Sequence, residues 1–184
     1  MKLSFPKPYA DFVARLRVLC GFALVASFGW FSHPDMRSLI FGLPVAAGGL
    51  ALRGWAAGHL AKNQSLATSG PYAYTRNPLY LGTLLVAAGL TIASRSVGLG
   101  LLFAIVFLAV YLPVIELEQQ HLRSLFPDYA AYAARVPMLL PRWTRTHEQR
   151  SFAWKLYVKN GEYQAVAGFL AGLLLLLWKA YARL

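Results

Sequence analysis

Five apolar segments dominate this chain and restrict the kind of fold that it can adopt. Short turns separate the first segment from the second (32–35) and the third from the fourth (94–96), a loop (62–77) separates the second from the third, and a long polar stretch precedes the fifth. Segments of this length and composition are typical of helices that cross a bilayer, which takes about 20 residues. The segments cover residues 16–31, 38–60, 78–93, 97–115 and 165–178. The sequence therefore predicts an all-α, polytopic integral membrane protein with about five transmembrane helices in one domain.

The composition agrees with this class and excludes a soluble domain. Hydrophobic residues make up 58% of the chain and charged residues only 14%, whereas a soluble surface needs about a quarter charged residues. The 18 Lys and Arg outnumber the 7 Asp and Glu, but they flank apolar segments instead of forming a stripe with stacking aromatics, so we expect no nucleic-acid partner. A single cysteine and the absence of clustered His and carboxylates predict neither a disulfide nor a metal site.

The two ends of the chain leave alternatives open. Residues 1–17 are basic and aromatic and suit an interfacial lead-in, although a cleaved signal peptide is the rival interpretation. We favour a retained first helix, because the basic region is long, contains Asp11 and lacks a clear cleavage site. The fifth apolar segment is short, so it either crosses with its aromatic flanks in the headgroups or lies partly re-entrant.

The distribution of cations predicts the orientation in the membrane. With five spans and the N-terminus inside, fourteen of the 18 Lys and Arg fall in cytoplasmic segments, as the positive-inside rule requires. This layout places the 62–77 loop and the 116–163 segment, predicted to be irregular, on one face. We expect the protein in a bacterial inner membrane among its lipids, with its N-terminus and active site cytoplasmic.

The stretch from residue 68 to residue 82 carries the features of a polar site. Arg76 keeps its positive charge and can bind a carboxylate or phosphate through two hydrogen bonds. Gly70 and Gly82 allow close backbone approach, and Pro78 keeps Asn77 out of the helix with its amide free to pair. Three tyrosines surround the arginine: Tyr72, Tyr74 and Tyr80.

A second set of polar residues follows the fourth segment on the same predicted face. Glu116 and Glu118 lie where that segment emerges, and two residues apart on a helix only one of them is expected to face the site. A cation and an anion across a pocket match the carboxylate and ammonium of an amino acid. His121 could meet Glu118 on the helix. Nearer the N-terminus we expect Arg53 to snorkel to the interface, and His59 either contacts the ligand or is an interfacial polar residue.

Two motifs in this order resemble a known superfamily over residues 50–142. The first is Thr68-Ser69-Gly70-Pro71-Tyr72 leading into Arg76-Asn77-Pro78-Leu79-Tyr80-Leu81-Gly82. After a hairpin, the second consists of Glu118, Leu122, Phe126, Tyr129, Tyr132, Arg135-Val136-Pro137 and Pro141. This pattern resembles the isoprenylcysteine carboxyl methyltransferase and phospholipid methyltransferase superfamily. The core motifs then fall in residues 62–142, between N-terminal helices (1–61) and a C-terminal extension (143–184).

The resemblance implies an S-adenosylmethionine-dependent methyltransferase with its cofactor between a membrane hairpin and a C-terminal cap. A lipophilic substrate would arrive through the bilayer, and its methyl-accepting atom, oxygen, nitrogen or sulfur, stays open. The implied catalytic residues are Arg76 and Glu118. We add His59 to the residues that the resemblance implies. The candidate cofactor-binding residues are then His59, Tyr72, Tyr74, Arg76, Asn77, Tyr80, Glu118, Tyr132 and Pro137.

Three departures from the superfamily pattern keep other functions open. Asn77 replaces a frequent histidine, Gln119 replaces the second of two paired glutamates, and the extension after Pro141 lies outside the core pattern. An NADPH-dependent enzyme of the sterol reductase type shares a similar Arg-x-Pro-x-Tyr signal. A non-catalytic membrane scaffold would retain the fold without the chemistry.

Overall fold

The structure, a computed structural model, describes residues 5–142 and 150–182, and throughout these ranges it contains helices and no strands. The predicted all-α class is thereby confirmed. In chain order the helices are α1 (Lys7–Phe31), α2 (Met36–Ala57), η1 (Gly70–Ala73), α3 (Pro78–Ser94), α4 (Val97–Val106), η2 (Phe107–Tyr111), α5 (Leu112–Leu125), α6 (Tyr129–Arg135), α7 (Trp154–Lys159) and α8 (Glu162–Tyr181).

Five long helical units agree with the predicted number of spans. Four are long and apolar enough to cross a membrane: α1, α2, α8 and the continuous rod formed by α4, η2 and α5 (Val97–Leu125). The fifth unit, α3, is shorter, with 17 residues. The 20 residues of α8 begin before the predicted segment and end after it, so the C-terminal helix has the length of a full span.

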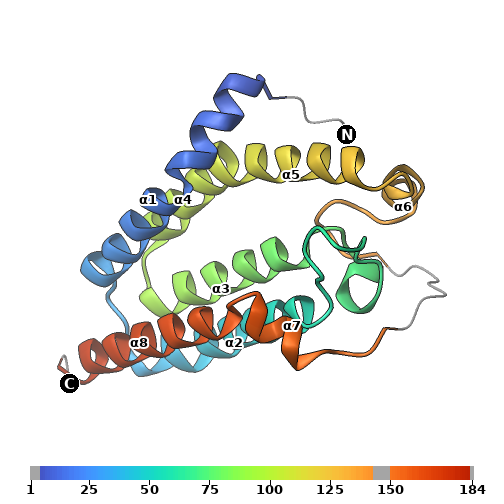
Figure 1. The fold of residues 1–184 in the computed structure, drawn as a ribbon. Coiled ribbons are helices and arrows are strands. Elements are labelled where there is room, and N and C mark those ends of the chain that lie inside the picture. Colours follow the sequence, from blue (N-terminus) through green and yellow to red (C-terminus); the bar gives the residue numbers. More distant parts are fainter. Residues whose placement is uncertain (1–4, 143–149, 183–184) are drawn as a thin grey trace.

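The long helices form two layers that diverge from one end of the molecule. Figure 1 shows α2, α3 and α8 packed in one layer, while α1 crosses the α4–α5 rod in the other. The layers meet where α1 turns into α2 and α3 turns into α4, and they separate towards α6. The space between the layers at this wider end is where the candidate site lies.

Small residues bring α2 and α3 into the closest helix contact of the fold. A Cβ added to Gly49 of α2 would lie 2.6 Å from the backbone oxygen of Gly82 in α3, and Gly42 meets Gly89 in the same way further along. Such close backbone approach is how membrane helices gain van der Waals contact. Gly42 and Gly49 make this approach possible, whereas nothing lies within 4 Å of a Cβ at Gly48.

Hydrogen bonds join the two turns at the narrow end. Asp35 caps α2 by accepting from the backbone N–H of Ser38, and the Ser38 hydroxyl donates to the Ala93 carbonyl of α3 at 2.9 Å. Arg95, in the tight turn after α3, forms an ion pair with Asp35. The predicted turns at 32–35 and 94–96 are therefore correct, and they also bind each other.

A lysine of α8 closes the same end. The Nζ of Lys179 donates to the carbonyl oxygens of Gly29 and Ser32 at 2.8 and 2.9 Å. These are unpaired carbonyls at the C-terminus of α1, where the helix dipole favours a cation. The C-terminal extension is in this way attached to the first helix.

Proline opens the hydrogen-bond ladder of the α4–α5 rod. Pro113 has no N–H to donate to the carbonyl four residues earlier, which belongs to Ala109. The Tyr9 hydroxyl of α1 donates to this carbonyl at 2.6 Å, and the turn before the proline is the π-helical η2.

Two predicted boundaries are wrong. The first helix begins at Lys7, so the basic lead-in from that residue onward is part of α1. The segment predicted to be irregular contains the end of α5, all of α6 and all of α7. Helices that continue past the apolar core can carry charged residues, because water solvates them there, and an apolar-run criterion then ends them too early.

Candidate active site

A cavity of about 1000 Å³ lies between the two layers. Its lining comes from α1, α2, the loop after α2, η1, α3, the α4–α5 rod, α6 and the first residues of α8. Five of the predicted site residues line it: Tyr72, Arg76, Tyr80, Glu118 and Tyr132. The two polar segments identified in the sequence therefore contribute to one cavity.

Arg76 enters this cavity from the loop between η1 and α3. Its Nη1 donates to the Gln119 side-chain oxygen at 2.7 Å and lies 3.5 Å from the Tyr129 hydroxyl. Both partners are neutral, so the contacts orient the guanidinium without compensating its charge. The Nε of Arg76 and the Nε2 of Gln119 are buried without a hydrogen-bond partner in the described structure, and such unsatisfied groups are uncommon without a functional reason.

Glu118 holds the other predicted charge of the site and has its own partners. Its Oε1 accepts a hydrogen bond from the Tyr80 hydroxyl at 3.0 Å and lies 3.7 Å from Nη1 of Arg17 in α1. Arg76 and Glu118 thus share the cavity without being each other's partner. His121 lines the cavity too, but the contacts of Glu118 in the described structure are with Tyr80 and Arg17.

Three further predicted site residues, Tyr74, Asn77 and Pro137, do not line the cavity. They attach residues 137–142, which we call the cap, to the 74–77 loop. Residues 137–142 run beside this loop and exchange hydrogen bonds with it. The bonds are Arg76 N–H to Pro137 O (2.9 Å), Asn77 Nδ2 to Met138 O (2.8 Å) and Arg142 N–H to Tyr74 O (3.0 Å). The side-chain amide of Asn77, predicted to be free to pair, pairs with the carbonyl of Met138 in the cap.

His59 also lies outside the cavity lining. Its ring nitrogens face two backbone carbonyls, those of Trp55 at 2.9 Å and Arg150 at 3.1 Å. The ring packs so closely on Gly70 that a Cβ there would lie 2.6 Å from it, and Gly70 has a φ of +59°. In this structure His59 connects α2, the η1 turn and the segment before α7.

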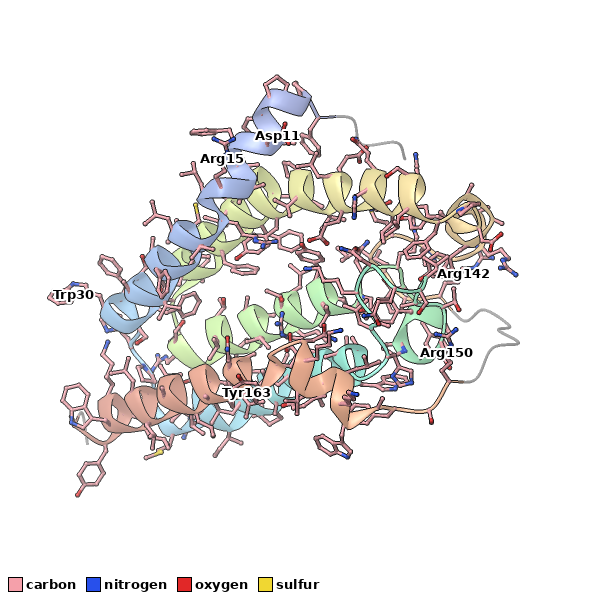
Figure 2. The ribbon with its side chains drawn as sticks, viewed as in Figure 1. Asp11, Arg15, Trp30, Arg142, Arg150 and Tyr163 are labelled. Atoms are coloured by element: carbon pink, nitrogen blue, oxygen red, sulfur yellow. The ribbon has the colours of Figure 1, made fainter. Side chains whose placement is uncertain are left out.

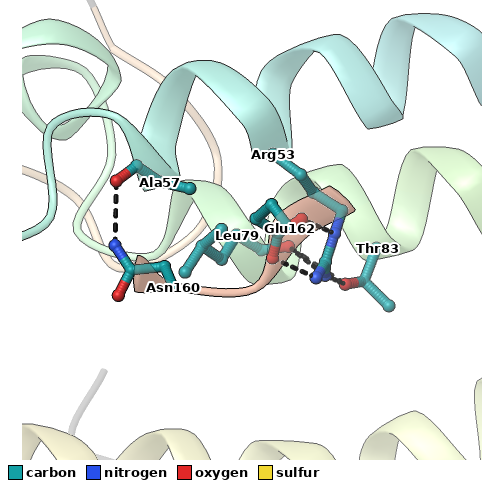
Figure 3. Close-up of polar contacts among 6 residues, drawn as sticks. All are labelled: Arg53, Ala57, Leu79, Thr83, Asn160 and Glu162. Atoms are coloured by element: carbon teal, nitrogen blue, oxygen red, sulfur yellow. Dashed lines mark hydrogen bonds and ion pairs between the residues drawn. The ribbon is translucent and has the colours of Figure 1, made fainter. Parts of the chain in front are cut away.

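Arg53, expected from the sequence to snorkel, has an ion-pair partner within the protein. Figure 3 shows its guanidinium paired with Glu162 at the start of α8, with Nε and Nη2 donating to the two carboxylate oxygens at 3.0 and 2.6 Å. Its Nη1 donates to the Thr83 hydroxyl at 2.5 Å and approaches the Leu79 carbonyl at 3.4 Å. An ionisable residue inside an apolar segment usually has such a partner.

The C-terminal extension reaches the cavity beside this ion pair. Asn160 and Glu162 both line it, and Nδ2 of Asn160 donates to the carbonyls of Ala57 and Leu60 at 2.9 Å each. These bonds satisfy carbonyls at the end of α2. The extension that the core motifs left unexplained is thus part of the cavity wall.

Burial keeps three tyrosines of the cavity lining neutral. Desolvation by burial raises the pKa of Tyr72 and of Tyr132 far above the ordinary tyrosine value, and it raises the pKa of Tyr129 as well. The Tyr132 hydroxyl donates to the Tyr72 carbonyl at 2.8 Å. These hydroxyls act as hydrogen-bond donors at neutral pH.

Metal-ligating side chains do not gather around this cavity. In residues 5–142 and 150–182, no group of three or more His, Cys, Asp or Glu is placed to hold a metal ion.

Comparison with known families identifies the core of the chain. The family model described as phospholipid methyltransferase matches residues 45–129. Over these residues the chain is similar to the phospholipid methyltransferase family. The matched segment includes Arg76, Tyr80 and Glu118, and the match confirms the superfamily resemblance stated from the two motifs. The helices α1, α7 and α8 lie outside the matched phospholipid methyltransferase segment.

Two curated relatives carry names that describe metal resistance. The chain is 38% identical over 133 residues to the cobalt-zinc-cadmium resistance protein CzcN of Cupriavidus metallidurans, an alignment that covers 71% of this chain and 59% of that protein. It is 29% identical over 155 residues to the nickel-cobalt-cadmium resistance protein NccN of Alcaligenes xylosoxydans xylosoxydans, with 76% and 71% covered. No solved structure matches the chain.

Proposed function

We propose that this protein is an integral membrane methyltransferase that uses S-adenosylmethionine to methylate a lipophilic or membrane-partitioning acceptor. The observation that carries the proposal is the shared cavity, in which Arg76 and Glu118 from two distant polar segments meet apolar walls. Its volume of about 1000 Å³ lies at the upper end of the range for small-molecule sites. The phospholipid methyltransferase match over the same segments supports this reaction class.

The residues present fit the charged groups of the cofactor. Arg76 is a cation with neutral partners and a buried, unsatisfied Nε, which suits the carboxylate of the methionine part. Glu118 is half-exposed in the cavity and suits its ammonium group. Bound S-adenosylmethionine supplies a methyl group activated by a positively charged sulfur.

The protein's own contribution is alignment. Tyr80 fixes one oxygen of Glu118, and Gln119 orients the guanidinium of Arg76. The cap of residues 137–142 is hydrogen-bonded to the loop that carries Arg76, which holds this residue in position for the reaction. A carboxylate acceptor needs no base, whereas an amine or thiol must lose a proton, and Glu118 and His121 are two acid–base groups of the cavity lining that could take it.

Calorimetry on the purified protein tests this proposal. We expect S-adenosylmethionine to bind and NADPH not to bind, with Arg76→Ala weakening the interaction. Binding of NADPH alone would support the reductase alternative. Binding of neither ligand would favour a scaffold, for which the resistance names of the two relatives offer a context.

We also propose that the mouth of the cavity faces the cytoplasm of a bacterial inner membrane. The wide end of the molecule carries the cation-rich 62–77 loop, with Lys62 and Arg76, and helix α6, with Arg135. The positive-inside rule predicts such cations on a cytoplasmic face. Labelling of a cysteine placed at Lys62 by an impermeant reagent should require opened membranes. Labelling in intact cells would reverse the orientation.

A further inference from the structure

The turn between α7 and α8 is fixed to α2 at two points. The Nδ2 of Asn160 has two hydrogens and donates to two carbonyl oxygens, those of Ala57 and Leu60, at 2.9 Å each. Two residues later, Glu162 forms its ion pair with Arg53. These contacts hold the turn against the end of α2, where both Asn160 and Glu162 line the cavity.

The backbone of this turn is fixed as well as its side chains. Gly161 has a φ of +72°, a left-handed conformation that glycine adopts more easily than other residues. The backbone N–H of Asn160 donates to the Leu156 carbonyl at 2.8 Å at the end of α7, and α8 begins at Glu162. Asn160 therefore occupies a defined position at the edge of the cavity.

The side-chain oxygen of Asn160 is the group that is left for a ligand. A reversed amide would turn this oxygen towards two carbonyl oxygens, which donate no hydrogen, so the bonds of Nδ2 fix the orientation of the amide. In the part of the chain that the structure describes, Oδ1 has no hydrogen-bond partner. Figure 3 shows this oxygen pointing away from Ala57. An acceptor held in this way can recognise an N–H or O–H group of a bound molecule.

The lining beside Asn160 is polar. The loop after α2 contributes the neutral side chains of Asn63 and Ser65, next to Lys62. The C-terminal extension is attached to this loop, because Nη1 of Arg150 donates to the Ser65 hydroxyl at 3.1 Å. Figure 2 shows Arg150 at the wide end of the molecule. Loop and extension thus form one polar wall at this end.

The other walls of the cavity have a different chemistry. Arg76 and Glu118 carry the opposite charges that suit the amino-acid end of S-adenosylmethionine. The α1 wall is apolar apart from Arg17 and suits a lipophilic acceptor. Its apolar members are Ala14, Val18, Gly21, Phe22 and Val25. A nucleoside is polar and uncharged and carries amino and hydroxyl donors, so the wall that contains Asn160 matches it best.

We propose that Asn160 binds the nucleoside part of S-adenosylmethionine, with its Oδ1 accepting a hydrogen bond from the amino group of the base or from a hydroxyl of the sugar. The inference rests on the proposed function. It gives the C-terminal extension a direct part in cofactor binding, although the matched methyltransferase segment ends at residue 129.

Calorimetry with cofactor analogues tests this contact without any methyl transfer. The full chain in nanodiscs is titrated with S-adenosylhomocysteine, which contains the nucleoside and has no methyl group to transfer. Two analogues each lack one kind of donor. S-inosylhomocysteine lacks the amino group of the base, and the dideoxy form of S-adenosylhomocysteine lacks both sugar hydroxyls. We expect the unaltered protein to bind at least one analogue about three- to tenfold more weakly, the size of a lost neutral hydrogen bond.

Asn160→Ala should weaken S-adenosylhomocysteine binding by about the same factor and reduce the discrimination against one analogue. Reduced discrimination against S-inosylhomocysteine assigns the contact to the amino group, and reduced discrimination against the dideoxy form assigns it to a sugar hydroxyl. Gln164→Ala is the matched control, because Gln164 carries the same amide in the extension, is exposed and lies outside the cavity lining. This control should bind all three ligands as the unaltered protein does.

Two results would overturn the inference and leave the proposed function intact. In the first, Asn160→Ala weakens all three ligands equally or not at all, so the side chain makes no contact with the nucleoside donors. In the second, the unaltered protein binds all three ligands equally, a result that does not depend on how Asn160→Ala folds. An unaltered protein that binds neither S-adenosylhomocysteine nor S-adenosylmethionine would overturn the proposed function and this inference with it.

Discussion

The Arg53–Glu162 ion pair makes a sharp prediction about stability. It joins α2 to α8 through two hydrogen bonds of 2.6 and 3.0 Å, and the two side chains are only 23% and 9% exposed. Glu162→Gln preserves the size of the side chain but leaves the guanidinium without a counter-charge. Breaking a buried pair in this way costs 3–5 kcal/mol, and the partial exposure of Arg53 reduces our expectation to about 2–4 kcal/mol.

Thermal unfolding in mild detergent measures this loss. For a chain of this size each kcal/mol shifts the melting temperature by about 2–4 °C, so we expect Glu162→Gln to melt roughly 5–15 °C lower. Glu116→Gln is the matched control, because within residues 5–142 and 150–182 the hydrogen-bond contact of Glu116 is a long one, 3.5 Å from Gln120. Pairing Glu162→Met with Arg53→Met should recover much of the loss, since no unpaired charge remains. If Glu162→Gln and Glu116→Gln melt together, the ion pair does not stabilise the attachment of α8.

Further predictions concern the site, the helix packing and pH. Arg76→Ala and Glu118→Ala should each lower methyl transfer about tenfold or more through the loss of roughly 1.5–3 kcal/mol, and near-normal turnover by an inserted variant would remove that residue from the site. Gly49→Leu should make the protein protease-sensitive in membranes, because even a Cβ there would lie 2.6 Å from the α3 backbone, whereas Gly172→Leu, with nothing within 4 Å, should not. The pKa of Asp35 is lowered, chiefly by a backbone hydrogen bond at the start of α2, so its stabilisation is present above the ordinary value of 3.8 and is lost as the pH falls through the lower folded value. Asp35→Asn should remove this acid-dependent part of the melting curve, and an unchanged curve would contradict the assignment.

Most of the fold could be predicted from the sequence because a bilayer limits the choices. Apolar segments of spanning length must be helical where they contact lipid. This constraint determines the fold class and the number of long helical units. The ends were harder to predict. Nothing in an apolar-run criterion shows that α5 continues to Leu125, because its last turns carry polar and charged residues.

Site residues could be predicted where they belong to a short sequence motif. They could not be predicted where residues far apart in the sequence come together in the fold. Arg76, Glu118 and Tyr80 could be selected because permanent charge, acid at a helix end and aromatics cluster in short stretches. Arg17 and Glu162 lie in helices far from these motifs, and only the packing of α1 and α8 brings them to the cavity. The presence of Arg53 inside an apolar segment was the one signal that a buried acidic partner was needed.

The glutamine at position 119 links the departure from the superfamily pattern to the electrostatics of the cavity. Its amide oxygen accepts from Arg76 at 2.7 Å, so the guanidinium is oriented as a carboxylate would orient it. A glutamate there would also neutralise Arg76 and leave the lining with a smaller excess of positive charge. The amide keeps the geometry and leaves the charge available. A ligand carboxylate can therefore pair with Arg76, whose contacts in the described structure are with the neutral side chains of Gln119 and Tyr129. An anionic group needs such an available cation to bind in a cavity of low dielectric constant.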